Sequence, residues 1–249
     1  MSGHSKWSQI KRQKGAADAK RGQLFTKLSR ELALAVREGG DNPDINPRLR
    51  LAIQKARDNN MPMESIERAV KRGSGGSEAS KLVEANFEGY GPGGVAILLL
   101  ALTDNRNRTV SEVRNVLSRG GGSLGESGCV AWVFESKGVI TVEAPDAEEL
   151  ALFAIDAGAE DVKVVDNAVE VQTSPEDLEK VRKALEQGEF TVVCAELSMV
   201  ANNTIMLSER SALSTLKLLD RLEDLDDVQR VFTNADFPDE ALEQYRAQA

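Results

Sequence analysis

Between Gly138 and Leu197 the hydrophobic pattern alternates between strand and helix periods, and this alternation constrains the fold more than any other feature of the chain. Four segments read as strands, namely GVITVEA, VKVV, VEVQT and FTVVCAEL. A helical pattern follows the first, behind the capping pair Asp146 and Glu149, and another follows the third, behind Ser174-Pro175. The order βαββαβ is the ferredoxin-like signature. Residues 136–201 are therefore predicted to form an inserted α/β domain.

The segments on either side of this unit complement each other. Before it come strands near 83–88 and 95–102, a helix near 109–119 and a strand at Val130–Glu135. After it come a short strand near 204–207, a helix over 209–225 and the strand VQRVFT. Together these pieces make a second α/β sandwich that the first one interrupts. The prediction is a discontinuous domain of residues 79–135 plus 202–249.

The first third of the chain has helical periodicity. Apolar residues between 16 and 38 form one stripe, Asn46-Pro47 supplies the start of a second helix, and a third helix runs to Gly73. GSGGSEAS, from Gly73 to Ser80, reads as a flexible linker. The predicted fold class is α+β: an N-terminal three-helix bundle over residues 1–78 plus two ferredoxin-like-type α/β domains, one inserted in the other.

Charge is divided unevenly along the chain. The formal net charge is −9, yet residues 1–74 hold 16 Lys and Arg against 8 Asp and Glu, whereas the remainder holds 15 against 32. Binding of a polyanion responds to the local potential rather than to the total charge. A cationic N-terminal part can therefore dock nucleic acid while the acidic part faces away or meets a basic protein.

The opening segment GHSKWSQIKRQKGAADAKRGQLF concentrates this charge. It contains the single histidine, one of the two tryptophans and six basic side chains. Lysines and arginines neutralise phosphates while an aromatic ring stacks on an accessible base, so the segment favours RNA or single strands over a duplex. The alternative is that Trp7 packs on the bundle and the lysines only solubilise it. Membrane attachment is not favoured, because no lipidation motif or continuous amphipathic helix accompanies the tryptophan.

A second basic motif, TDNRNRT, lies between a buried strand and the start of a helix. A helix N-terminus favours anions, so Arg106 and Arg108 are candidates for phosphate contacts. Helix capping with both arginines in solvent is the alternative.

Enzyme chemistry lacks its usual parts. His4 is the only histidine, GYGPGG runs into a strand where a dinucleotide site needs a helix, and Cys129 and Cys194 have no CxxC spacing. The acidic run Glu223–Asp227 reads as solvated surface, and SRGGGSLGESG as a loop, with an anion-binding nest as the alternative. No catalytic residue, cofactor, metal or small-molecule substrate is predicted. The longest apolar run, VAILLLAL, is too short for a membrane helix, so a cytoplasmic location is expected.

Several blocks of this sequence resemble the YebC/PmpR family, which includes the mitochondrial translational activator of cytochrome oxidase. The blocks occur in family order over nearly the whole chain: GHSKWSQIKRQKGAADAKRGQLFTKL, NPRLRLAIQKARDNNMP, IERAVKRG, EGYGPGGVAI, DNRNRTVSEVR, GGSLGESGCVAWVF and GAEDV. Departures lie within blocks: KRQKGAAD stands where many members carry a further histidine, and Cys129 where serine is common.

The resemblance implies a helical N-terminal domain joined to two α/β domains. It also implies a non-enzymatic role, either as a DNA-binding transcriptional regulator or as a ribosome-associated translation factor that relieves stalling. Together with Arg12 and Arg30 from the basic segments, the residues matching the family's basic motifs are the candidate nucleic-acid contacts: His4, Ser5, Lys6, Trp7, Lys11, Lys14, Lys20, Arg21, Lys27, Arg106 and Arg108.

The sequence thus predicts a nucleic-acid-binding regulator of gene expression. Its expected partner is DNA, ribosomal RNA or tRNA, and the ribosome is a further candidate partner. Two alternatives stay open. An acidic adaptor would bind partner proteins through residues 75–249 without touching nucleic acid. A sequence-specific repressor would read duplex DNA with the helices around Arg48 to Arg72.

Overall fold

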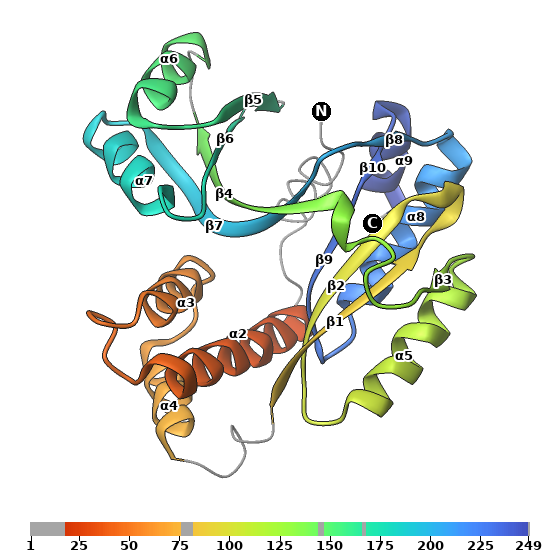
Figure 1. Ribbon diagram of the computed structural model, residues 1–249, viewed down its shortest axis with the longest axis horizontal. Coiled ribbons are helices and arrows are strands. Elements are labelled where there is room, and N and C mark those ends of the chain that lie inside the picture. The colour runs from red at the N-terminus through yellow and green to blue at the C-terminus, as the bar shows by residue number, and fades with distance from the viewer. Residues whose placement is uncertain (1–17, 76–81, 144–146, 166–167, 249) are drawn as a thin grey trace.

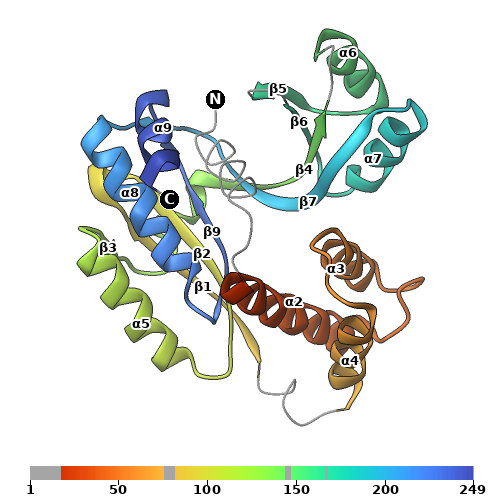
Figure 2. The ribbon, with the colours of Figure 1, turned by 180° about the vertical axis from the view of Figure 1, so that it is seen from behind.

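The computed structural model describes residues 18–75, 82–143, 147–165 and 168–248, which form a helical bundle and two sheets flanked by helices (Figure 1). The view from behind shows the bundle below the second sheet and beside the first (Figure 2). The α+β class predicted from the sequence is confirmed.

The bundle consists of α2 (Asp18–Gly39), α3 (Pro47–Asp58) and α4 (Met63–Ser74). Both shorter helices pack along α2, around a core that includes Leu32, Leu49 and Ile66 (Figure 1). The buried Asn46 begins α3: its side-chain oxygen accepts from the Leu49 amide at 3.0 Å, and its Nδ2 donates to the carbonyls of Ala35 and Gly40. One cap thus also ties the start of α3 to the end of α2.

Gly73 corrects the linker prediction. Helix α4 continues through Ser74, and Gly73 is buried against α2. A Cβ at this position would lie 2.8 Å from the Ala33 carbonyl oxygen and 2.8 Å from the Val36 Cβ. The glycine therefore permits close helix packing rather than opening a linker. The rest of the predicted linker, residues 76–80, lies outside the described residues.

The first sheet has the order β3-β1-β2-β9. Strands β1 (Val83–Tyr90) and β2 (Ala96–Thr103) form an antiparallel hairpin around the short 3-10 turn η2 (Pro92–Gly94), while β3 (Ser123–Leu124) and β9 (Val228–Thr233) lie on the outer edges. GYGPGG is thus a hairpin turn, with Gly93 at φ 78°.

Three helices cover one face of this sheet: α5 (Arg106–Arg119), α8 (Glu209–Glu223) and α9 (Asp239–Gln248). The core between them contains Phe87, Leu99, Leu216 and Phe237. The predicted strand near 204–207 is β8 (Ile205–Met206), which pairs in parallel with β10 (Ala235–Asp236) rather than joining the larger sheet.

The predicted strand at Val130–Glu135 is wrong from Val130 to Val133. Residues Ala131–Val133 form a 3-10 turn, η3, and strand β4 begins only at Phe134 and runs to Glu143. The physical reason is Glu88, whose carboxylate accepts the amides of Gly128, Val130 and Ala131 and so withdraws them from strand pairing.

The second sheet has the order β5-β6-β4-β7, with all neighbours antiparallel. It is formed by β4, β5 (Asp161–Val165), β6 (Ala168–Thr173) and β7 (Thr191–Ala201), with α6 (Ala147–Ala157) and α7 (Leu178–Gln187) on one face. This is the predicted βαββαβ unit, with the strand order of a ferredoxin-like sheet.

Strands β4 and β7 extend beyond this unit and pair from Phe134↔Ala201 to Glu143↔Thr191. Their far ends reach the first sheet, where Phe134 and Met199 pack with Leu98 and Phe232 (Figure 1). The predicted boundary between residues 135 and 136 falls inside β4. The division into domains 1–78, 79–135 plus 202–249, and 136–201 stays a prediction.

Candidate nucleic-acid interface

The structure describes part of the predicted interface. His4, Ser5, Lys6, Trp7, Lys11, Arg12 and Lys14 lie outside the described residues. Lys20 lies in the first turn of α2, whose described side chains begin at Arg21. Lys27 and Arg30 follow on the same helix, and Arg106 and Arg108 lie in the first turn of α5.

Lys27 and Arg30 both face the first sheet. The Lys27 ammonium donates to the Glu223 carbonyl, and Arg30 Nη1 donates to the Asp226 carbonyl at 2.6 Å and to Asp227 Oδ1 at 3.1 Å. Two cations predicted to contact nucleic acid therefore dock α2 onto the segment between α8 and β9. Their role in nucleic-acid binding stays a prediction.

Asp227 collects further donors on its other oxygen. Oδ2 accepts from Arg108 at 2.7 Å, from Thr109 at 2.8 Å and from Thr103 at 3.1 Å, and the residue is 3% exposed. Burial opposes ionisation of this carboxyl, but the hydrogen bonds from Arg108, Thr109 and Thr103 outweigh it and hold the pKa of Asp227 below its ordinary value. Asp227 is therefore an ionised, fully bonded junction between α2, α5 and β9.

The arginines of TDNRNRT differ from each other. Asn105 caps α5, because its side chain accepts from the Arg108 amide at 3.1 Å, while the Arg108 guanidinium forms ion pairs with Asp104 and Asp227. The hydrogen bonds that the guanidinium donates to Asp227 and Asp104 raise the pKa of Arg108. Arg106 is exposed and forms no ion pair with the described residues. The two arginines thus differ in ion pairing and not in exposure, because the Arg108 side chain is itself 44% exposed.

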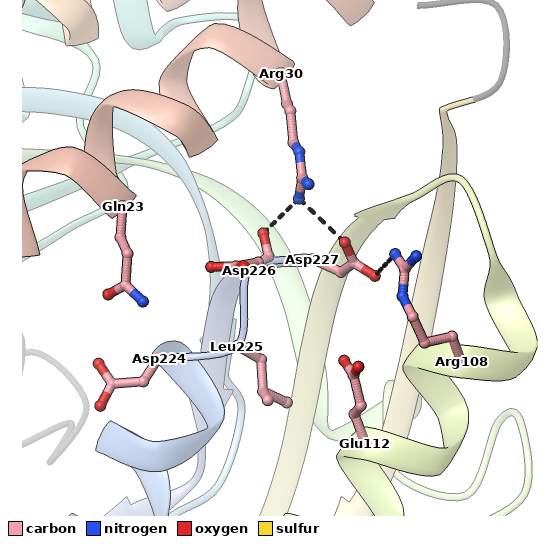
Figure 3. Close-up of a pocket in the computed structure, with 8 residues that line it drawn as sticks. All are labelled: Gln23, Arg30, Arg108, Glu112, Asp224, Leu225, Asp226 and Asp227. Carbon is pink, nitrogen blue, oxygen red and sulfur yellow. Dashed lines mark hydrogen bonds and ion pairs between the residues drawn. The ribbon is translucent and has the colours of Figure 1, made fainter. Parts of the chain in front are cut away.

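A pocket of about 420 Å³ lies where α2 meets α5 and the α8–β9 connection. Figure 3 shows Arg30 and Arg108 converging on Asp227, with Glu112 below them and Gln23 facing Asp224 across the opening. Its remaining lining residues are Leu225 and Asp226. Because the arginines are already paired with carboxylate, this pocket is a poor phosphate site. No group of acids, histidine or cysteines that could hold a metal ion occurs among the described residues.

Sequence reasoning missed this junction, because the run Glu223–Asp227 was interpreted as solvated surface. The interpretation is wrong for Asp227, which is buried. The available signal was its position directly before the apolar strand VQRVFT, where a side chain enters the core.

The bundle keeps another set of cations exposed. They lie at the exposed ends of all three helices and form no ion pair within the described part of the chain: Arg21, Arg57, Lys71 and Arg72. Three of them were not among the predicted site residues. Arg48, in contrast, pairs with Glu38 and Glu84. The bundle therefore presents exposed positive charge that the junction at Asp227 does not neutralise.

These features define a class of α+β protein. A helical bundle with exposed cations docks through charged contacts on one α/β unit, and a second α/β unit is inserted in the first. Residues 5–76 match the family model of the TACO1/YebC protein N-terminal domain, and residues 82–235 match that of the TACO1/YebC second and third domain. The chain belongs to the TACO1/YebC family, which confirms the resemblance seen in the sequence.

Relatives align over the full length. A protein of Dehalococcoides mccartyi named "probable transcriptional regulatory protein" is 58% identical over 100% of both chains, and one of Halothermothrix orenii with that name is 52% identical over 98% of each. The crystal structure of a conserved hypothetical protein from Aquifex aeolicus superposes with a TM-score of 0.82 at 48% identity, covering 89% of this chain and 92% of that one.

Among the described residues, no helix is both long and apolar enough to cross a membrane.

Proposed function

We propose that this protein is a non-enzymatic, nucleic-acid-binding regulator of gene expression that acts in the cytoplasm, and that its N-terminal helical part supplies the phosphate contacts. The observation that carries the proposal is the separation of charge: residues 1–74 hold 16 basic against 8 acidic side chains in a chain of net charge −9. The names of the relatives support a regulatory role.

The cations available to nucleic acid follow from the contacts of α2. Lys27 and Arg30 already donate to the α8–β9 connection, where Asp224 and Asp226 are exposed and repel phosphate. Nucleic acid therefore contacts other exposed cations of the bundle, namely Arg57, Lys71 and Arg72. The basic opening segment with Trp7 favours RNA or single strands as the target, through stacking on accessible bases.

The test compares two triple variants of equal charge change. Arg57, Lys71 and Arg72 are changed to alanine in one, and the exposed Arg210, Lys217 and Arg221 of α8 in the other. Binding to single-stranded RNA, duplex DNA and ribosomes is measured against salt concentration. The first variant is expected to lower the salt slope by about 0.7–0.9 for each lost phosphate contact, and the second to leave it unchanged.

The opening segment is tested separately by changing Lys6, Lys11 and Lys14 together, and by a version that starts at Asp18 and so keeps α2 whole. Both are expected to weaken binding. If affinity and salt slope stay unchanged in these variants and in the bundle variant, the contacts have been assigned wrongly. Full regulatory function in a protein without measurable nucleic-acid affinity would favour the adaptor role instead.

A further inference from the structure

Trp132 is held at the surface in a fixed orientation. The residue is 70% exposed, and its indole Nε1 donates to the Cys129 carbonyl at 3.1 Å. Tyr90, 40% exposed, donates its hydroxyl to the same carbonyl oxygen, also at 3.1 Å. One backbone acceptor therefore positions two exposed aromatic rings, which lie on a loop and on a neighbouring strand that are far apart in sequence.

The loop that carries Trp132 is rigidly built. The Glu88 carboxylate is 6% exposed and accepts the amides of Gly128, Val130 and Ala131 at 2.7–2.8 Å, while the Glu88 carbonyl accepts from Gly125. Burial opposes ionisation of this carboxyl, but the three amides prevail and lower its pKa. Such ordering before binding reduces the entropy that a partner has to remove on docking.

The same contacts exclude one class of ligand. The amides of this glycine-containing loop would form an anion-binding nest, but the protein's own Glu88 already fills it. Residues 120–135 contain Glu126 and Glu135, both exposed, and no lysine or arginine. This stretch therefore offers no cationic side chain to bind a phosphate beside Trp132.

The surrounding charge favours a cation. Residues 82–135 and 202–248 together hold 9 Lys and Arg against 16 Asp and Glu. An indole face attracts cations through its quadrupole, and the planar, weakly hydrated guanidinium stacks on it better than an ammonium group does.

We propose that Trp132 and Tyr90 form a docking site for an arginine side chain of a basic partner protein, with the guanidinium stacked on the Trp132 indole and Glu126 as the nearby counter-charge. This site goes beyond nucleic-acid binding by the bundle and does not depend on it. It gives the acidic α/β part of the molecule a partner of its own.

The test uses the full-length protein and two labelled peptides of equal charge, nona-arginine and nona-lysine, at 150 mM salt. Trp132→Ala is expected to weaken nona-arginine binding about three- to tenfold, and nona-lysine binding less. Trp132→Phe is expected to retain part of the preference for nona-arginine over nona-lysine, because a phenyl ring also attracts cations, with a weaker quadrupole than indole. Leu152→Ala, at a residue 72% exposed on α6, is the matched control and is expected to change neither affinity.

A second measurement follows the wild-type protein by NMR while nona-arginine is added. The indole N–H resonance of Trp132, assigned by its loss in Trp132→Phe, is expected to shift on addition of nona-arginine. Unchanged nona-arginine affinity in Trp132→Ala, or an unmoved indole resonance, would overturn the proposal. If Trp132→Ala instead weakens binding of oligouridylate as strongly as that of the peptide, the site stacks a nucleobase, and the arginine proposal is wrong.

Discussion

Arg30 and Asp227 are separated by 197 residues in the sequence, and their side chains form an ion pair of 3.1 Å. Because Asp227 also binds Arg108, one buried carboxylate connects the helical bundle with two elements of the first α/β unit. The apolar clusters of the bundle and of this unit are separate. Polar contacts therefore hold the bundle on this unit: the junction at Asp227 with its neighbouring hydrogen bonds to backbone carbonyls, and, further along, the hydrogen bond from Arg37 to the Leu82 carbonyl and the ion pair of Arg48 with Glu84.

Asp227→Asn is expected to destabilise the folded protein by about 2–4 kcal/mol, because it leaves Arg30 and Arg108 without a buried counter-charge. Denaturant unfolding of the full chain measures the change. Asp226→Asn is the control: its side chain is exposed and only its carbonyl binds Arg30, so a change within about 0.5 kcal/mol is expected. Equal stability of the two variants would show that the junction contributes nothing.

The depressed pKa of Asp227 predicts the pH at which this contribution disappears. A carboxyl whose folded pKa lies below the ordinary value of 3.8 stabilises the fold at pH values above 3.8 and loses that effect as the pH falls through the folded pKa. The stability difference between wild type and Asp227→Asn is therefore expected to be full at pH 7 and to shrink below about pH 4. A difference independent of pH down to pH 2 would contradict the assigned ionisation.

Glu88→Gln is expected to loosen the loop that carries Trp132. The carboxylate accepts on both oxygens, whereas the glutamine amide would turn an NH₂ group toward at least one donating backbone amide. A loss of about 1–3 kcal/mol is expected, together with faster hydrogen exchange of the Val130 and Ala131 amides. Glu126→Gln, at an exposed acid of the same loop, is expected to leave exchange at both amides unchanged.

Two glycines of the bundle predict opposite effects of the same substitution. Gly73→Ala places a Cβ against the Ala33 carbonyl and the Val36 side chain, so the α2–α4 contact has to open and about 1–3 kcal/mol is lost. Gly22→Ala, in α2 with no atom within 4 Å of the added Cβ, is expected to gain about 0.5–1 kcal/mol from helix propensity. Thermal unfolding distinguishes them, and a shared sign would contradict this packing.

The periodicity of apolar residues was enough to predict those helices and strands that bury one face against a single neighbouring layer. The four strands and two helices of the inserted unit alternate clearly, because Ile140, Val142, Val169 and Val171 face one helix layer. The prediction of a strand at Val130–Glu135 was wrong because the apolar residues at its start are buried around a turn. Glu88, more than forty positions earlier in the sequence, holds that turn in place. A single-sequence pattern carries no record of such a distant acceptor.

The positive charge of the candidate interface was predictable from the sequence, but the ion pairs that individual cations form within the protein were not. The density of cations in residues 1–74 is visible in the sequence, but nothing local distinguishes Arg30, which pairs with Asp227, from Arg21, which is exposed. Likewise a glycine can signal a linker or a close helix contact, and Gly73 takes the second role because Ala33 passes beside it. These distinctions depend on contacts between segments far apart in the chain.

The position of β9 has a consequence for synthesis on the ribosome. Strand β2 receives its outer neighbour only from residues 228–233, after the whole inserted unit has been made. The inserted βαββαβ unit is contiguous and can close first, whereas the earlier hairpin waits with one open edge. Asp227 is synthesised immediately before β9. A chain that ends within α8 therefore lacks both strand β9 and the carboxylate that binds Arg30 of α2. Completion of the first sheet and formation of the contacts of Asp227 with α2 are thus late, coupled events in the synthesis of the chain.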